Sequence, residues 1–440
     1  MQRIHWSIFT ILLSFNGMSQ TYWRLENENK EEILLTIKAD VKNMTFEAFT
    51  REDALKELAG TFTYMLAKTA GKLKYPEIVH SNGKISITKD TTHYSGTFYY
   101  LDKTYTFTAK TWQNSFVGTI VDNRNRQHPL QGERVLSNKP LKDYGAIIDK
   151  AFNQTEKYYY DRKLQASSEW KSFKNEVNKV KANIADDYEL VATLYWYGKK
   201  LPMGQYEIRK IFTREAIPNR PKNPSTRELN PKTILLDLGN IPEDAKGMEE
   251  IFIHIQKGNF AKLIIDARGR RNISIHSAVL LCDHLTNQPI LWGCYLTKLG
   301  TDPLGKIPVH PELETSLKNF RSMSQNNEIL TGNGVYLKTE PAVPGFKGKV
   351  YLLTDHRTSK VAEALAIWFK KEKMATLVGE ESSGSSMLTQ TIDLDKQYQI
   401  SVQVAQFLDR EGKSYVNIKT VPDMVVNEGD ALNFLLKKIN

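Results

Sequence analysis

The stretch VYLLTDHRTSKVAEALAIWFKKEKMATLVGEESSGSSMLTQ, residues 350–390, decides the fold of the C-terminal half of this chain. It opens with the apolar run 350–353, which is typical of a strand buried on both faces. Apolar residues at helical spacing follow between Val361 and Trp368, and a second apolar run covers 375–378. The stretch therefore predicts a β–α–β unit and, with it, a parallel sheet.

The polar residues of this stretch come directly after its two predicted strands. They occupy residues 355–360 and 379–386. Ligands of parallel sheets gather at the carboxyl ends of the strands, so we expect a site where these two loops meet. Thr358 or Ser359 is placed to cap the first amides of the helix.

The same alternation of strands and helices continues upstream of this stretch. Strands are predicted at 233–238, 263–266 and 290–295, and helices at 248–256 and 275–285. We therefore expect a C-terminal α/β core over residues 232–440.

The N-terminal part has a different pattern. Residues 84–135 alternate with period two and are rich in Thr and Tyr, and Asn82-Gly83 is a hairpin signal. We predict a β-rich accessory domain over residues 20–140, built as an antiparallel meander with one wet face. A helical segment over 141–213 and a proline-containing linker over 214–231 follow.

Composition excludes several classes of protein. The chain has 440 residues, 40% of them hydrophobic and 25% charged, as in soluble globular proteins. Its net charge of +10 comes without a dense basic run, so we predict a generally basic surface and no nucleic-acid partner. Cys282 and Cys294 could form one disulfide or remain buried free thiols, and no metal-ligand spacing or cofactor motif is present.

The first 19 residues have the pattern of a signal peptide. Arg3 is followed by a short apolar run, and Gly17 and Ser19 are small enough for signal peptidase. The run is too short to span a bilayer, and no cysteine follows it that could carry a lipid. We expect an exported, soluble protein, periplasmic or extracellular, without a transmembrane segment.

Several stretches of the C-terminal half resemble peptidase family S41, the C-terminal processing or tail-specific serine peptidases. The segments that match the family in order are Leu263–Gly269, Val350–Glu363, Ala375–Glu380, Val421–Val426 and Asp430–Leu432. The resemblance covers about half the chain and leaves no room for the PDZ-type domain that many members insert. It implies a multidomain α+β protein with an S41-like core of the ClpP/crotonase type.

The resemblance also assigns positions to the catalytic groups, and this sequence departs from the family at four of them. Lys360 stands where the family has its nucleophilic serine, and Ser385 stands where it has its lysine base. Gln205 replaces the histidine of members that lack the lysine. After Gly269, the oxyanion loop contains Arg270 and Arg271 where the family has glycines.

Three functions are compatible with these departures. The first is a pseudo-peptidase with a degenerate Ser/Lys site, which binds a peptide or a protein segment in the cleft of the core. The second is an active serine peptidase, either with Ser359 as a displaced nucleophile beside Lys360 or His356, or with Ser385 and Lys360 in exchanged roles. The third is an envelope protein that binds a ligand through its β-rich domain.

Overall fold

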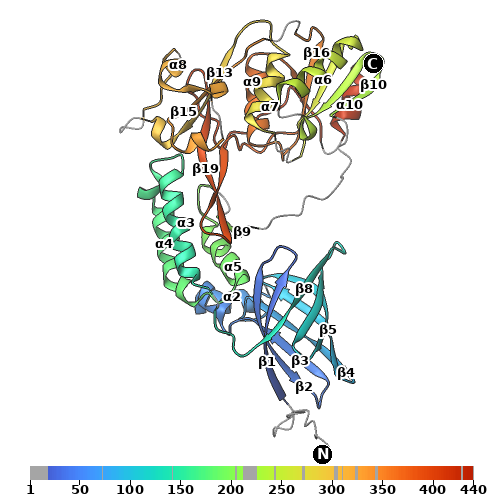
Figure 1. Cartoon of the computed structure of the whole chain (residues 1–440), viewed down its shortest axis with the longest axis vertical. Helices are drawn as coiled ribbons and strands as arrows, with labels where there is room; N and C mark the ends of the chain where they lie inside the picture. Colours follow the sequence, from blue (N-terminus) through green and yellow to red (C-terminus); the bar gives the residue numbers. More distant parts are fainter. Residues whose placement is uncertain are drawn as a thin grey trace, which may run out of the picture. The chain divides into compact units, whose positions relative to one another are not determined.

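The computed structural model describes most of the chain, and the chain divides into two compact units (Figure 1). Unit 1 comprises residues 1–154, 166–213 and 392–400, and unit 2 comprises residues 155–165, 214–391 and 401–440. The described residues are 18–71, 73–140, 142–203, 206–211, 225–241, 244–269, 273–301, 306–309, 311–322, 326–341, 345–427 and 430–439. Residues 1–17 of the predicted signal peptide lie outside them.

Unit 1 contains a closed barrel of eight antiparallel strands in sequence order. The first strand pairs with the eighth, which removes both edges of the meander that the sequence predicts. The strands are β1 (Met18–Asn27), β2 (Glu32–Asp40), β3 (Thr45–Phe49), β4 (Val79–Thr88), β5 (Thr91–Tyr100), β6 (Lys103–Trp112), β7 (Ser115–Val121) and β8 (Gln127–Val135). Two short helices, α1 (Ala54–Ala59) and α2 (Thr61–Thr69), connect β3 to β4.

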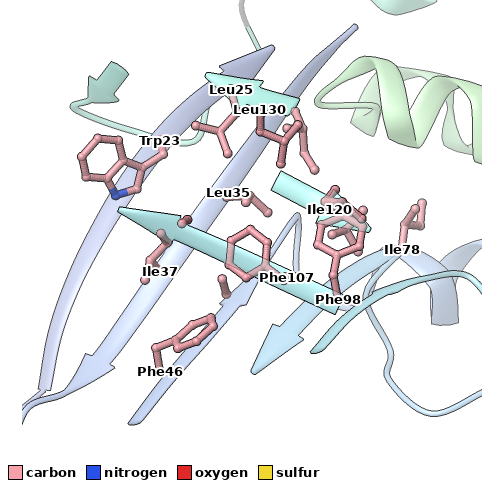
Figure 2. Packing of buried hydrophobic residues seen from close by; sticks show 14 of the residues in the cluster. Trp23, Leu25, Leu35, Ile37, Phe46, Ile78, Phe98, Phe107, Ile120 and Leu130 are labelled. Carbon is pink, nitrogen blue, oxygen red and sulfur yellow. The ribbon is translucent and has the colours of Figure 1, made fainter. Parts of the chain in front are cut away.

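The interior of the barrel is filled with apolar side chains (Figure 2). Large rings from neighbouring strands pack together there: Phe107 lies 6.1 Å from Phe98 and 6.5 Å from Phe116, between ring centroids. Trp23 and Leu130 close the barrel from its first and last strands and are at most 3% exposed. Period-two alternation therefore builds a packed core, as in other small barrels.

The Asn82-Gly83 hairpin that the sequence predicts is wrong. Both residues lie inside β4, and the chain turns instead at Lys89, which has a φ of 53°. Gly83 faces Gly96 across the β4–β5 pair, where a Cβ on Gly83 would lie 2.1 Å from the carbonyl oxygen of Ser95. The glycine therefore serves a close approach of two strands and not a turn.

Helices complete unit 1. They are α3 (Tyr144–Tyr158), α4 (Ser168–Val180) and α5 (Asp187–Gly198), and a short strand, β9 (Ile208–Lys210), pairs with β19 (Tyr398–Asp409). β2 pairs with β3 only from Thr36 onward, so its first residues lack a partner strand on that side. The amides of Glu32 and Leu34 donate instead to the carboxylates of Asp187 and Asp186, at 2.7 and 2.9 Å.

Unit 2 is built on a six-stranded sheet in the order β10-β11-β12-β16-β17-β20. The strands are β10 (Thr226–Asn230), β11 (Thr233–Asp237), β12 (Lys262–Asp266), β16 (Lys349–Thr354), β17 (Thr376–Gly379) and β20 (Met424–Val425), and all but β10 pair in parallel. Its helices include α6 (Ala245–Lys257), α7 (Ile275–Asp283), α9 (Val361–Lys371) and α10 (Ala431–Ile439). Every residue of α9 from Val361 to Phe369 is buried.

A second sheet contains the remaining strands in the order β14-β15-β13-β19-β18. The strands new to the description are β13 (Leu291–Thr297), β14 (Lys318–Asn319), β15 (Gly334–Lys338) and β18 (Leu388–Asp393), and a short helix, α8 (Glu312–Ser316), precedes β14. Cys282 in α7 and Cys294 in β13 are buried free thiols, and burial raises the pKa of both, to about 12 for Cys294. None of the helices described has the length and apolar character that crossing a bilayer requires.

Candidate active site

Three parallel strands of unit 2 end beside one another, and polar loops follow each of them. β12 leads to Ala267–Gly269, β16 leads to the loop 355–360, and β17 leads to the serine-rich loop 380–386. Backbone hydrogen bonds connect the three: the amide of Ala267 donates to Leu353, and the amide of Glu380 donates to Thr354, both at 3.1 Å. The carboxyl ends of the strands therefore bring together the loops that the sequence predicts for the site.

Asp355 organises the loop after β16. Its carboxylate accepts hydrogen bonds from the amide of Gly269 at 3.0 Å and from the guanidinium of Arg357. Burial opposes ionisation of this group, but the amide of Gly269 and the contacts of Arg357 outweigh it and lower its pKa. Because Gly269 already donates to Asp355, this amide is engaged within the protein.

The helix α9 begins without a side-chain cap. Its N-cap residue is Lys360, and neither Thr358 nor Ser359 caps it, contrary to the sequence-based expectation. The hydroxyl of Thr358 donates instead to the carbonyl of Ala267 at 3.0 Å and accepts from the amide of Asp355 at 3.0 Å. The hydroxyl of Thr358 therefore bonds to the loops after β12 and β16 and not to the first amides of α9.

Lys360 has a strained backbone, with φ of 58° and ψ of −125°. This region disfavours any residue with a Cβ, and such strain persists only where the surrounding structure enforces it. A sharp strand-to-helix turn presents the side chain of its central residue outward, as in the nucleophile elbow of α/β-hydrolases. The side chain of Lys360 is exposed.

Lys360 and Ser385 are neighbours through their backbones. The amide of Lys360 donates to the carbonyl of Ser385, and the amide of Ser383 donates to the carbonyl of Thr358 at 3.0 Å. Among the described residues, no hydrogen bond joins Nζ of Lys360 to Oγ of Ser385. The structure therefore brings the two positions together without forming a side-chain dyad.

Glu363 is the buried centre of the site. It is 0% exposed and accepts hydrogen bonds from the hydroxyl of Ser382, from Thr420 at 2.7 Å and from the amide of Gly384 at 3.0 Å. Burial raises the pKa of Glu363 in spite of these donors. This role was not predicted, although a lone carboxylate in the apolar helix sequence VAEALAIWF was a signal for a buried acceptor.

The remaining predicted site residues are more peripheral or lie outside the described residues. His356 is exposed and its Nδ1 lies 2.9 Å from Glu380, and Ser359 is partly buried. Gln205, Arg270 and Arg271 lie outside the described residues. Within the described residues, no cluster of three or more His, Cys, Asp or Glu residues could hold a metal ion.

Comparison with known proteins gives one family and several distant folds. The model of peptidase family S41 matches residues 234–426. A lipoprotein from Streptococcus agalactiae is 16% identical and covers 68% of this chain and 96% of its own, with a TM-score of 0.43. A proposed peptidase from Parabacteroides merdae ATCC 43184 is 12% identical, with 67% and 93% covered and a TM-score of 0.44. The tricorn protease is 10% identical, with 91% and 44% covered and a TM-score of 0.42.

The family match, and not these low structural scores, carries the assignment. Its range begins in β11 and ends just after β20, so it contains the parallel strands and all three loops of the site. The family-like segments 263–269, 375–380 and 421–426 contain most of β12 and all of β17 and β20. Residues 234–426, somewhat less than half of the chain, match peptidase family S41.

Proposed function

We propose that this chain is an exported pseudo-peptidase, which binds a peptide or a segment of a partner protein at the carboxyl ends of β12, β16 and β17. The observation that carries the proposal is the identity of the residue at the strained start of α9. Lys360 stands there with its side chain exposed, at the position where the family has its nucleophile. A lysine ammonium donates hydrogen bonds and has no lone pair, so it cannot attack a carbonyl carbon.

The environment of Ser385 supports the same conclusion. Ser385 occupies the family position of the base, and a serine hydroxyl has no basicity at neutral pH. The backbone amide of Ser385 donates to Oγ of Ser383 at 3.1 Å, so it is not free to donate to a substrate. Because Gly269 donates to Asp355, its amide is not positioned to stabilise an oxyanion as well.

The scaffold around these groups supports a binding role. Glu363, Asp355 and Thr358 connect the three loops through hydrogen bonds in a buried environment, which holds the loops in one arrangement. A preorganised surface binds an extended ligand with a smaller loss of conformational entropy. The exposed ammonium of Lys360 would favour a carboxylate of the bound peptide.

An active enzyme with exchanged roles is the second candidate, because the backbones of Lys360 and Ser385 are hydrogen-bonded neighbours. A fluorophosphonate probe distinguishes the two. We expect no labelling of the folded wild-type chain, of Ser359→Ala or of Ser385→Ala. Labelling of the wild type that is lost in Ser385→Ala would establish the exchanged dyad, and labelling lost in Ser359→Ala would establish a displaced nucleophile; either result overturns the pseudo-peptidase.

The double variant Lys360→Ser/Ser385→Lys tests whether the exchanged residue types at these two positions are sufficient to explain an absence of peptidase activity. It places both family residue types at their family positions on the same scaffold. In parallel, peptide binding is measured by fluorescence anisotropy for the wild type and for Lys360→Gln, in which we expect weaker binding of peptides with a free carboxylate. Unchanged affinity in Lys360→Gln would place the bound peptide elsewhere.

A further inference from the structure

Unit 1 contains a cavity of about 270 Å³ at one end of its barrel. Its walls come from the β1–β2 turn, from the ends of β5 to β8 and from the first turns of α5. The cavity is larger than the engineered cavity of about 150 Å³ that takes up benzene in another protein. It therefore has room for a small ligand or for the end of a longer one.

Aromatic rings form one side of this cavity. Tyr100, Tyr105 and Tyr188 line it together with Phe98. Tyr100 and Tyr188 meet edge to face, with ring centroids 5.4 Å apart. In the described part of the chain, the hydroxyls of Tyr100 and Tyr105 make no hydrogen bond within the protein, so both remain available to a ligand.

The charge of the cavity is opposite to that of the whole chain. The chain carries a net charge of +10, yet the described residues that line the cavity include Glu28, Glu31 and Asp187 and neither lysine nor arginine. From the composition of the chain, a set of lining residues is expected to contain more basic than acidic side chains. The cavity is thus an acidic site in a basic protein.

Of these three carboxylates, only Glu31 forms no ion pair among the described residues, and the guanidinium of Arg209 interacts with it at longer range. Asp187 has Nζ of Lys210 at 3.3 Å, and Glu28 has Nδ1 of His128 at 2.8 Å. The carboxylate of Glu31 accepts a hydrogen bond from the side-chain Nδ2 of Asn27 at 2.7 Å, but no ion pair reaches it among the described residues. Burial raises the pKa of Glu31, and the nearby Asp187 and Glu28 add to this effect against the hydrogen bond from Asn27.

We propose that this cavity binds an organic ammonium ion, with the cation against the faces of the tyrosines and beside the carboxylate of Glu31. Aromatic faces attract ammonium groups through their quadrupoles, and cages of this composition bind methylated ammonium and related cations. The carboxylate of Glu31 supplies the counter-charge to the bound cation. A quaternary ammonium and the side-chain ammonium of a lysine share this chemistry.

The test is isothermal titration calorimetry of the full chain with choline and with its neutral carbon isostere, 3,3-dimethylbutan-1-ol. The two ligands have nearly the same shape and differ in charge. We expect choline to bind at least about tenfold more tightly. Equal affinities, or no heat of binding with any cation, would overturn the proposal. Nα-acetyl-lysine amide forms the other arm: tighter binding of this compound than of choline assigns the site to lysine side chains.

Two variants test the residues, with thermal unfolding as the check that each is folded. Glu31→Gln preserves shape and removes the charge, and we expect it to weaken cation binding about tenfold without affecting the neutral alcohol. Asp90→Asn, in the exposed β4–β5 turn, changes the net charge by the same amount and should leave affinity unchanged. If Glu31→Gln is unfolded, Tyr105→Leu replaces it. Cation affinity that is equal in the wild type and in a folded site variant contradicts the site.

Discussion

Lys360 and Glu363 lie three residues apart at the start of α9, and the comparison of their surroundings separates scaffold from chemistry. Glu363 is fully buried and accepts hydrogen bonds from the serine-rich loop and from Thr420. Lys360 is exposed, and its link to that loop is the amide that donates to Ser385. The buried side of the turn holds the loops together, while the exposed side presents the side chain of Lys360.

This difference shows that the hydrogen bonds that hold the loops come from Glu363 and from backbone groups, and not from the side chain of Lys360. The strained backbone at Lys360 is held by main-chain hydrogen bonds: its amide donates to Ser385, and its carbonyl accepts from the amide of Ala364 at 3.1 Å. A family-like loop arrangement therefore specifies a scaffold, and activity depends on the side chains that the scaffold presents.

The largest effect is expected from the buried side. Glu363→Ala leaves the hydroxyls of Ser382 and Thr420 and the amide of Gly384 without their acceptor, so we expect the free energy of unfolding to fall by about 3 kcal/mol or more. Urea denaturation followed by fluorescence measures it. Glu381→Ala, an exposed glutamate in the same loop, and Ser385→Ala should each change stability by less than about 0.5 kcal/mol. A small effect of Glu363→Ala would contradict the claim that the buried hydrogen bonds of Glu363 stabilise the loops.

An intermediate effect with a pH signature is expected for Asp355. Its lowered pKa means that the ionised form stabilises the fold at neutral pH, and that this contribution is lost as pH falls below about 3.8. We expect Asp355→Asn to lower the free energy of unfolding by about 1 to 2 kcal/mol at pH 7, with a difference from wild type that shrinks in acid. Asp393→Asn, at an exposed position of β18, provides the matched control. A difference that is constant with pH would contradict this account of Asp355.

The smallest effect is expected at Lys360 itself. Glycine tolerates a φ of 58°, and relief of about 1 to 3 kcal/mol of strain outweighs the extra entropy of the unfolded chain, about 0.5 to 1 kcal/mol. Lys360→Gly should therefore stabilise the protein by about 1 kcal/mol in the same denaturation assay. Lys396→Gly, at an exposed position without a positive φ, should instead destabilise it. If Lys360→Gly destabilises the protein, the lysine side chain stabilises the fold by more free energy than its backbone strain costs.

Local patterns in the sequence were sufficient for the elements of the core. The apolar run 350–353 and the helical spacing from Val361 to Trp368 correspond to β16 and α9, because both depend on side chains within a few residues of one another. The family motifs then located the loops of the site. The cap of α9 and the turn at Asn82-Gly83 were wrong because tertiary contacts override local preference.

The sequence by itself determined the β-rich N-terminal part and the parallel α/β core of the chain, and it predicts an exchange of residue types at positions 360 and 385. The tertiary structure alone decided that the meander closes through β1 and β8, that Thr358 bonds to Ala267, and that Glu363 becomes the acceptor for the serine-rich loop. Each of these depends on hydrogen bonds between residues distant in sequence. Such bonds form only when folding excludes water from both partners, which no local pattern encodes.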